Sequence, residues 1–204
     1  MKLTNKPIKR LSLYIFLIFL AFQTPSQADD IRDFQIEGIS IGDSLLDYVS
    51  EEKINKSLIG AYPGDDTFLP SEFNNLSFFK IYDSLQIVFK KNDKEFIIHS
   101  ISGIISYENN IKKCEKKKNE IVDELSELFK SAKITDEGKR IHPQDKKSIV
   151  TNVIIDIGEK VGIFADHVTV SCFDWSETSS FYDHLRIGIK TQEYDKWLFE
   201  KAYK

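Results

Sequence analysis

Residues 84–132 have the sequence SLQIVFKKNDKEFIIHSISGIISYENNIKKCEKKKNEIVDELSELFKSA, and this stretch decides the fold. Apolar and polar side chains alternate over residues 85–89 and again over residues 97–107. This period of two predicts two β-strands, joined by a polar turn at residues 90–94. The apolar spacing then changes to three and four, which predicts one long amphipathic helix over residues 110–132.

The C-terminal third of the chain predicts three more strands and a final helix. Residues 149–157, 164–173 and 185–190 each alternate apolar with polar side chains. Thr191 is expected to begin the C-terminal helix. Sequential strands with short connections form antiparallel sheets. We therefore expect an α+β fold in which the 110–132 helix and the C-terminal helix pack on one antiparallel sheet.

The other segments predict shorter elements. Asp43 and Ser50 are each expected to cap a short helix, because their side-chain oxygens can accept a free backbone amide. Residues 76–82 are expected to form a strand that leads into the central hairpin. Residues 61–75 and 134–147 contain proline and glycine among polar residues, which predicts loops.

Residues 1–28 have the pattern of a secretory signal peptide. A basic start precedes 12 residues, 11–22, that are apolar except for Ser12, and small residues before position 29 predict cleavage between Ala28 and Asp29. The apolar run is shorter than the roughly 20 residues that span a membrane. We expect residues 29–204 to form a single globular, soluble domain without an integral membrane anchor, in the periplasm of a bacterium or secreted from it.

The charge of this expected mature chain argues against nucleic acid as a partner. The leader holds four of the 28 basic residues and none of the 32 acidic ones, so 24 basic residues remain and the net charge becomes −8. An acidic surface has no electrostatic attraction for a phosphate backbone.

The two cysteines predict a disulfide bond. Cys114 falls on the apolar stripe of the long helix, and Cys172 shares a strand face with Val168 and Val170. Both side chains should enter the same core, and an exported protein meets an oxidising compartment. The alternative is two buried free thiols that behave as small apolar groups.

Gly42-Asp43-Ser44-Leu45 resembles the nucleophile block of the GDSL hydrolases. The resemblance implies Ser44 as the nucleophile of a serine esterase. Two further features of that family are missing, because no histidine follows an aspartate by three positions and no Gly-x-Asn-Asp block is present. That family also has a parallel sheet. The favoured interpretation is therefore that Asp43 caps a helix and Leu45 enters the core.

The histidines predict neither a metal site nor a cofactor site. Asp166-His167 and Asp183-His184 are adjacent pairs, and adjacent residues of a strand point to opposite faces. No His-x-x-x-His or Cys-x-x-Cys spacing exists, so surface histidines are the favoured interpretation.

Two surfaces are candidates for binding. Trp175, Phe181 and Tyr182 lie in an aromatic connection that could form a binding surface, although such residues equally cover a core from outside. The lysines of residues 112–118 could attract an anion such as a lipid head group, although a solvated helix face is the more common outcome.

Three segments carry a resemblance to a group of small exported proteins of marine bacteria with AT-rich genomes. They are residues 39–48, residues 97–103 and Asp183-His184-Leu185-Arg186. The group has no established activity, so the resemblance implies export and no reaction. The leading hypothesis is a non-catalytic binding or envelope-associated module for a protein or small ligand. The alternatives are a serine esterase that uses Ser44 and an anion-binding protein that uses the lysine-rich helix.

Overall fold

The computed structural model describes residues 30–143, 145–161 and 163–204. The predicted leader, with its cleavage site at Ala28 and Asp29, lies outside these residues. Within them, no helix has the length and apolar character that a membrane crossing requires.

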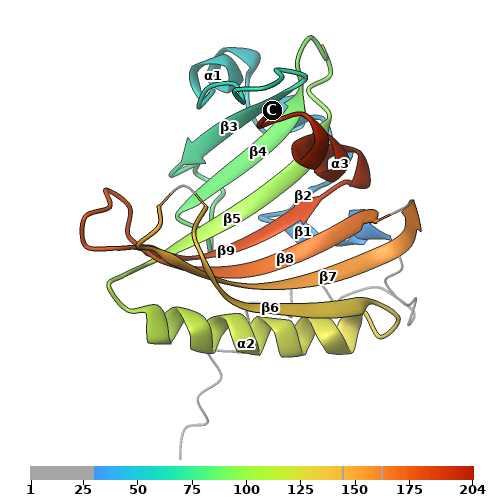
Figure 1. The fold of residues 1–204 in the computed structure, drawn as a ribbon. Coiled ribbons are helices and arrows are strands. Elements are labelled where there is room, and N and C mark those ends of the chain that lie inside the picture. The colour runs from blue at the N-terminus through green and yellow to red at the C-terminus, as the bar shows by residue number, and fades with distance from the viewer. Residues whose placement is uncertain (1–29, 144, 162) are drawn as a thin grey trace, which may run out of the picture.

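Seven antiparallel strands form one sheet. They are β3 (Phe68–Asn74), β4 (Ser84–Lys90), β5 (Ile98–Glu108), β6 (Lys133–Ile141), β7 (Ile149–Val161), β8 (Phe164–Asp174) and β9 (Asp183–Lys190). Their order across the sheet is β3-β4-β5-β9-β8-β7-β6 (Figure 1). The last strand, β9, lies between β5 and β8, so the middle of the sheet joins the two halves of the chain.

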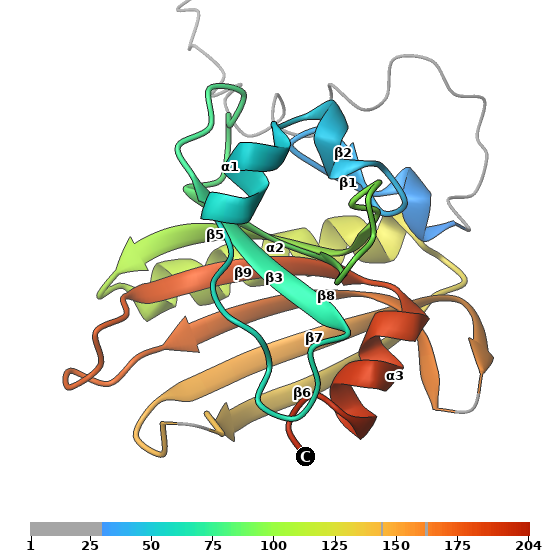
Figure 2. The same cartoon turned by 90° about the horizontal axis from the view of Figure 1, so that it is seen from above.

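Helices lie on both faces of the sheet. One face carries α2 (Ile111–Leu128) and a small N-terminal hairpin, β1 (Gln35–Ile36) with β2 (Ile39–Ser40) (Figure 2). The opposite face carries α3 (Gln192–Glu200), while α1 (Glu51–Lys56) lies near the β3 edge. The predicted α+β fold, with both helices packed on an antiparallel sheet, is confirmed.

The main core fills the space between the sheet and the layer of α2 and the N-terminal hairpin. Alternate residues of the strands other than β6 point into it, and Leu125 and Phe129 meet them from the α2 side. A smaller cluster on the opposite face joins α3 to the β3–β4 end of the sheet; it contains Phe68, Val88, Tyr194, Trp197 and Ala202. The second cluster is small, so α3 protects only part of its face.

The predicted disulfide is present. Cys114 of α2 and Cys172 of β8 are both completely buried, and their Cα atoms are 6.0 Å apart. The bond fixes the long helix to the middle of the sheet across a sequence separation of 58 residues.

Several local predictions were wrong. Residues 68–74 form strand β3 inside the predicted loop, whereas the predicted strand at 76–82 is irregular. Residues 133–141 form edge strand β6, although a loop was predicted from residue 134. An edge strand buries little of its surface, and every residue of β6 except Glu137 is exposed. Its polar sequence therefore lacks the alternation that signals a strand.

The helix limits also differ in detail. The α2 helix ends at Leu128, and the chain turns before β6 begins. Ser50 and Thr191 cap α1 and α3 as predicted. Asp43 does not cap its helix, because Ser44 holds that position at the 3-10 helix Leu45–Asp47.

Candidate binding site on the open sheet face

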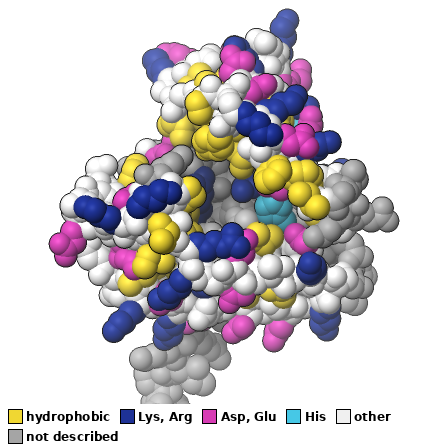
Figure 3. Space-filling view, in the orientation of Figure 1, with side chains coloured by type: hydrophobic (Ala, Val, Ile, Leu, Met, Phe, Trp, Pro, Cys, Tyr) yellow, Lys and Arg dark blue, Asp and Glu magenta, His cyan; other side chains and the backbone are white. Residues whose placement is uncertain are grey.

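The sheet face opposite α2 is only partly covered. The α3 helix and residues 61–67 lie over one end of it, where the Trp197 indole donates to Asp65 Oδ1 (2.8 Å). Figure 3 shows a hollow over the middle of this face, with basic side chains visible inside it. We call this surface the open face and its depression the hollow.

Small side chains form the floor of the hollow. Every second residue of β9 belongs to the open face: His184, Arg186, Gly188 and Lys190. The neighbouring positions on β5 and β8 hold Ser100, Ser102, Thr169 and Ser171. A Cβ atom at Gly188 would lie 2.9 Å from Ser102 Oγ and 3.0 Å from Thr169 Oγ1, so glycine is needed there. The long side chains of Arg186 and Lys190 thus stand beside a low floor.

Arg186 is a half-buried cation without an ion pair to any described residue. Its guanidinium donates to the amide oxygen of Gln86, and the Gln86 amide nitrogen donates to Glu72 Oε2 (2.7 Å). No carboxylate of the described residues lies within ion-pair distance of it. Burial lowers the pKa of Arg186, although an arginine stays charged at neutral pH. Most of its five N–H donors have no partner within the described chain.

Lys190 is a second cation of this kind. Its ammonium makes no hydrogen bond and no ion pair with any described residue. Burial lowers the pKa of Lys190, against the attraction of Asp195 and with the added repulsion of Arg186. Lys190 is half-buried. Removing a charge from water without giving it a partner is costly in proportion to the burial, and such groups collect at functional sites.

The carboxylates around the hollow have other partners. Glu137 pairs with Arg140 (2.8 Å) and accepts from the Asn152 amide (2.8 Å). Asp195 lies 3.8 Å from His167 Nε2. These groups soften the positive potential of the hollow, but none of them neutralises Arg186 or Lys190 directly.

Aromatic rings stand at the end of the hollow beyond Arg186. Phe173 of β8 and His184 of β9 stack with their centroids 4.5 Å apart. The Trp175 ring lies 6.0 Å from Phe173, nearly parallel to it, and packs on Phe181 at 4.7 Å. We call Phe173, Trp175, Phe181 and His184 the aromatic stack.

The surroundings of His184 disfavour its protonated form. Burial lowers the pKa of His184. Its Nδ1 lies 3.2 Å from the indole nitrogen of Trp175, a donor, and 3.0 Å from the carbonyl oxygen of Tyr182, an acceptor. A single ring nitrogen serves only one of these partners in each tautomer. The Trp175 bond needs the unprotonated Nδ1, so protonation of the ring breaks it.

Two residues of the predicted aromatic surface, Trp175 and Phe181, belong to the aromatic stack at the end of the open face. Phe181 and Tyr182 are 62% and 66% exposed, while Trp175 is half-buried within the stack. The sequence singled out these three residues but missed Arg186 and Lys190. Basic residues that alternate with apolar ones on a strand are usual for a sheet with a solvated face, and only the folded structure shows that these two are half-buried.

The hydroxyl of Ser44 makes hydrogen bonds with backbone groups. Its hydroxyl donates to the carbonyl oxygen of Glu95 (2.6 Å) and accepts from the amide of Leu46 (3.3 Å). Among described residues, no histidine makes a hydrogen bond with it. The ring of His99 packs on Phe68, in the cluster beside α3. Asp43 accepts from the Tyr48 hydroxyl (2.6 Å) and from the Ser40 amide.

Some lysines of the lysine-rich helix α2 are buried or contact other side chains, and others are exposed. Lys112 and Lys116 are exposed, but Lys118 is only 7% exposed and the Lys113 ammonium lies 5.6 Å from the Tyr107 ring centre. Lys117 pairs loosely with Glu120 (3.5 Å).

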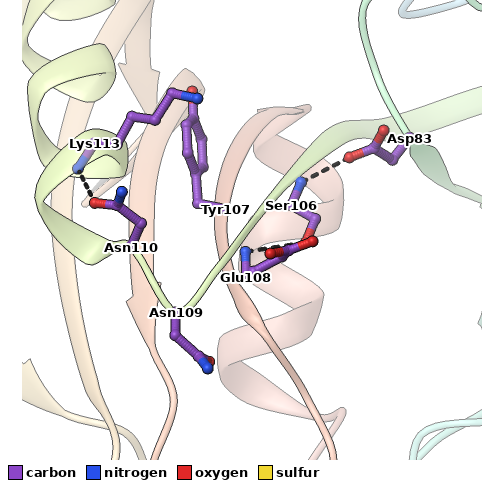
Figure 4. Close-up of a pocket in the computed structure, with 7 residues that line it drawn as sticks. All are labelled: Asp83, Ser106, Tyr107, Glu108, Asn109, Asn110 and Lys113. Atoms are coloured by element: carbon purple, nitrogen blue, oxygen red, sulfur yellow. Dashed lines mark hydrogen bonds between the residues drawn. The ribbon is translucent and has the colours of Figure 1, made fainter.

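The histidines do not form a metal centre within the described residues, where no group of three or more suitable ligands occurs. His167 is 6% exposed, so the expectation of surface histidines was wrong for that residue. Another depression, of about 720 Å³, lies where β5 meets α2 (Figure 4). Two of its polar side chains already make hydrogen bonds. Asp83 accepts from the Ser106 amide (2.7 Å), and Asn110 caps α2 by accepting from the Lys113 amide (3.1 Å).

Comparison with known proteins found no matching family model, no matching curated protein and no matching solved structure. A functional assignment for this chain therefore rests on the geometry of the open face.

Proposed function

We propose that this chain is a non-catalytic binding protein of the bacterial cell envelope that holds a small ligand in the hollow. The observation that carries the proposal is the pair of half-buried cations, Arg186 and Lys190, which have no ion pair with a described residue and lie on a partly covered sheet face. A fold normally covers such a face or gives its charges partners. A concave surface with a few converging polar groups is the usual form of a ligand site.

The remaining features support the same proposal. The signal-peptide pattern of residues 1–28 fits export, and the disulfide fits an oxidising compartment. Ser44 has bonds that a helix cap requires and lacks a histidine base in its hydrogen-bond shell, so binding is favoured over ester hydrolysis.

A substitution that fills the hollow tests this proposal. Ser102 is 4% exposed on its floor, and Ser102→Phe would place a ring there. The matched control is Ser131→Phe, at an exposed position beyond the end of α2. A panel of small acids, sugars and amino acids is titrated into isotope-labelled residues 29–204, and the backbone amide signals are followed by NMR.

We expect bound compounds to shift the amides of β5, β8 and β9, and we expect Ser102→Phe, but not Ser131→Phe, to abolish the shifts. Circular dichroism first confirms that both variants are folded. Shifts that centre on α2, or that survive in Ser102→Phe, would contradict the proposal.

A further inference from the structure

The open face combines positive charge and aromatic rings in one linear arrangement. His184, Arg186, Gly188 and Lys190 succeed one another on the same face of β9. A strand advances about 3.3 Å per residue, so the stacked ring of His184 begins roughly 7 Å along the strand from Arg186, and Lys190 lies roughly 13 Å from Arg186 in the other direction. The two cations flank the gap above Gly188.

The cations are suited to an anionic group. Arg186 donates to one acceptor, the amide oxygen of Gln86. The Lys190 ammonium has no hydrogen-bond acceptor among the described residues. A carboxylate, phosphate or sulfonate above Gly188 would accept from both, and the floor hydroxyls of Ser102 and Thr169 lie next to that position. Charge-assisted bonds of this kind are among the strongest polar contacts in a protein.

The aromatic stack is suited to a planar group. The rings of Phe173 and His184 are within 17° of parallel, and those of Phe173 and Trp175 within 14°. Flat apolar groups bind to such rings by stacking on a face or packing on an edge. The stack stands on the Arg186 side of the hollow, so one ligand can reach both parts.

We propose that the hollow binds a small amphipathic anion, with its acidic group held by Arg186 and Lys190 and its planar or apolar body against the aromatic stack. This inference rests on the proposed binding function and adds the chemical class of the ligand. The acidic groups that face the same region, Glu72, Glu137 and Asp195, disfavour a ligand with several negative charges and favour a single anionic group.

Two dyes that differ in one charge test the ligand class. Anilinonaphthalene sulfonate carries an aromatic body and a sulfonate, and N-phenylnaphthylamine is its uncharged counterpart. Their fluorescence is titrated with residues 29–204 and with variants Lys190→Met, Trp175→Ala and Lys116→Met. The last variant removes an equal charge from the exposed face of α2.

We expect Lys190→Met to weaken binding of the sulfonate dye by roughly tenfold or more, because one charge-assisted contact is lost. The same variant should bind the uncharged dye no less tightly, whereas Trp175→Ala should weaken both dyes. Lys116→Met should change neither, and added salt should weaken only the sulfonate dye.

The outcomes separate the two proposals. If Trp175→Ala and Ser102→Phe weaken both dyes while Lys190→Met changes neither, the hollow is a binding site but not for anions, and the inference is overturned. If Ser102→Phe leaves both dyes bound, the binding function of the hollow fails as well. A loss in Lys116→Met equal to that in Lys190→Met would assign the anion to α2 and overturn the inference.

Discussion

At the scale of single residues, Ser44 shows how a motif can have a structural explanation. Its hydroxyl donates to Glu95 and caps the helix at Leu45–Asp47, so the side chain joins the N-terminal segment to the turn before β5. We expect Ser44→Ala to lower the free energy of unfolding by about 1–2 kcal/mol, the usual effect of losing a cap and a hydrogen bond. Urea unfolding measures this loss.

The same variant checks for esterase activity. We expect a fluorophosphonate probe to leave the wild-type protein unlabelled, because no histidine of the described chain bonds to Ser44. Labelling of folded wild type that disappears in Ser44→Ala would identify a hydrolase and contradict the binding proposal.

The Lys190 ammonium should lower the stability of the fold. Because burial lowers its pKa, the unfolded chain holds the lysine proton more tightly than the folded chain does. The stability lost through the Lys190 ammonium is greatest below its lowered pKa. This loss disappears as the pH rises towards the ordinary lysine pKa of about 10.4. We expect Lys190→Met to be more stable than wild type at pH 7 by on the order of 1 kcal/mol, with the difference shrinking at alkaline pH.

Urea unfolding at a series of pH values tests this expectation. Lys116→Met is the control, since an exposed lysine should change stability by less than about 0.5 kcal/mol. A Lys190→Met variant that is less stable than wild type at neutral pH would show that the ammonium is well stabilised, and would remove the argument for an unsatisfied cation.

At the scale of elements, the disulfide joins the two parts of the fold that the sequence predicted best. Periodicity placed Cys114 and Cys172 in the same core, and the expected oxidising compartment favoured a disulfide over two free thiols. We expect the double variant Cys114→Ala/Cys172→Ala to lose about 4 kcal/mol of unfolding free energy, as chain entropy predicts for a loop of this length.

Urea unfolding of wild type with and without reductant provides the comparison. The reduced protein should unfold near the midpoint of the double variant, and alkylation followed by mass measurement confirms the redox state. Equal midpoints for the oxidised and reduced protein would mean that the α2–β8 packing alone sets the stability.

The strands that the sequence did not predict lie at the edges of the sheet, where alternate residues differ little in burial. Strand β6 lies at the edge, and nearly all of its residues are exposed. Strand β3 contains Pro70, a residue that favours a loop, but β3 is an edge strand, where a missing amide is tolerated. The central strands were found because they bury one face fully and therefore alternate clearly.

At the scale of the whole molecule, the candidate site depends on what covers the sheet. Arg186 and Lys190 occupy ordinary strand positions, and they are half-buried between neighbouring strands that are distant in sequence. Sequence periodicity shows on which face of a strand a residue lies, but it does not show how far other elements cover that face. The sequence could therefore predict the aromatic connection as a candidate surface but not the charged hollow beside it.

The open face also makes the whole fold sensitive to acid. Three histidines in or beside it, His99, His167 and His184, all have a pKa lowered chiefly by burial. The unfolded chain therefore binds protons at a higher pH than the folded chain, beginning near the ordinary value of about 6.5. Above that value the three histidines do not lower the free energy of unfolding. Below it, the free energy of unfolding falls by roughly 1.4 kcal/mol per pH unit for each proton taken up on unfolding.

We expect the free energy of unfolding to fall between pH 7.5 and pH 5.5, before most carboxylates are protonated. In the triple variant His99→Gln/His167→Gln/His184→Gln the fall should be nearly absent. A wild-type stability that stays constant across this range would show that the folded and unfolded chains bind equal numbers of protons. The three rings would then be able to accept protons within the fold, and the open face would be more accessible to water than its packing indicates.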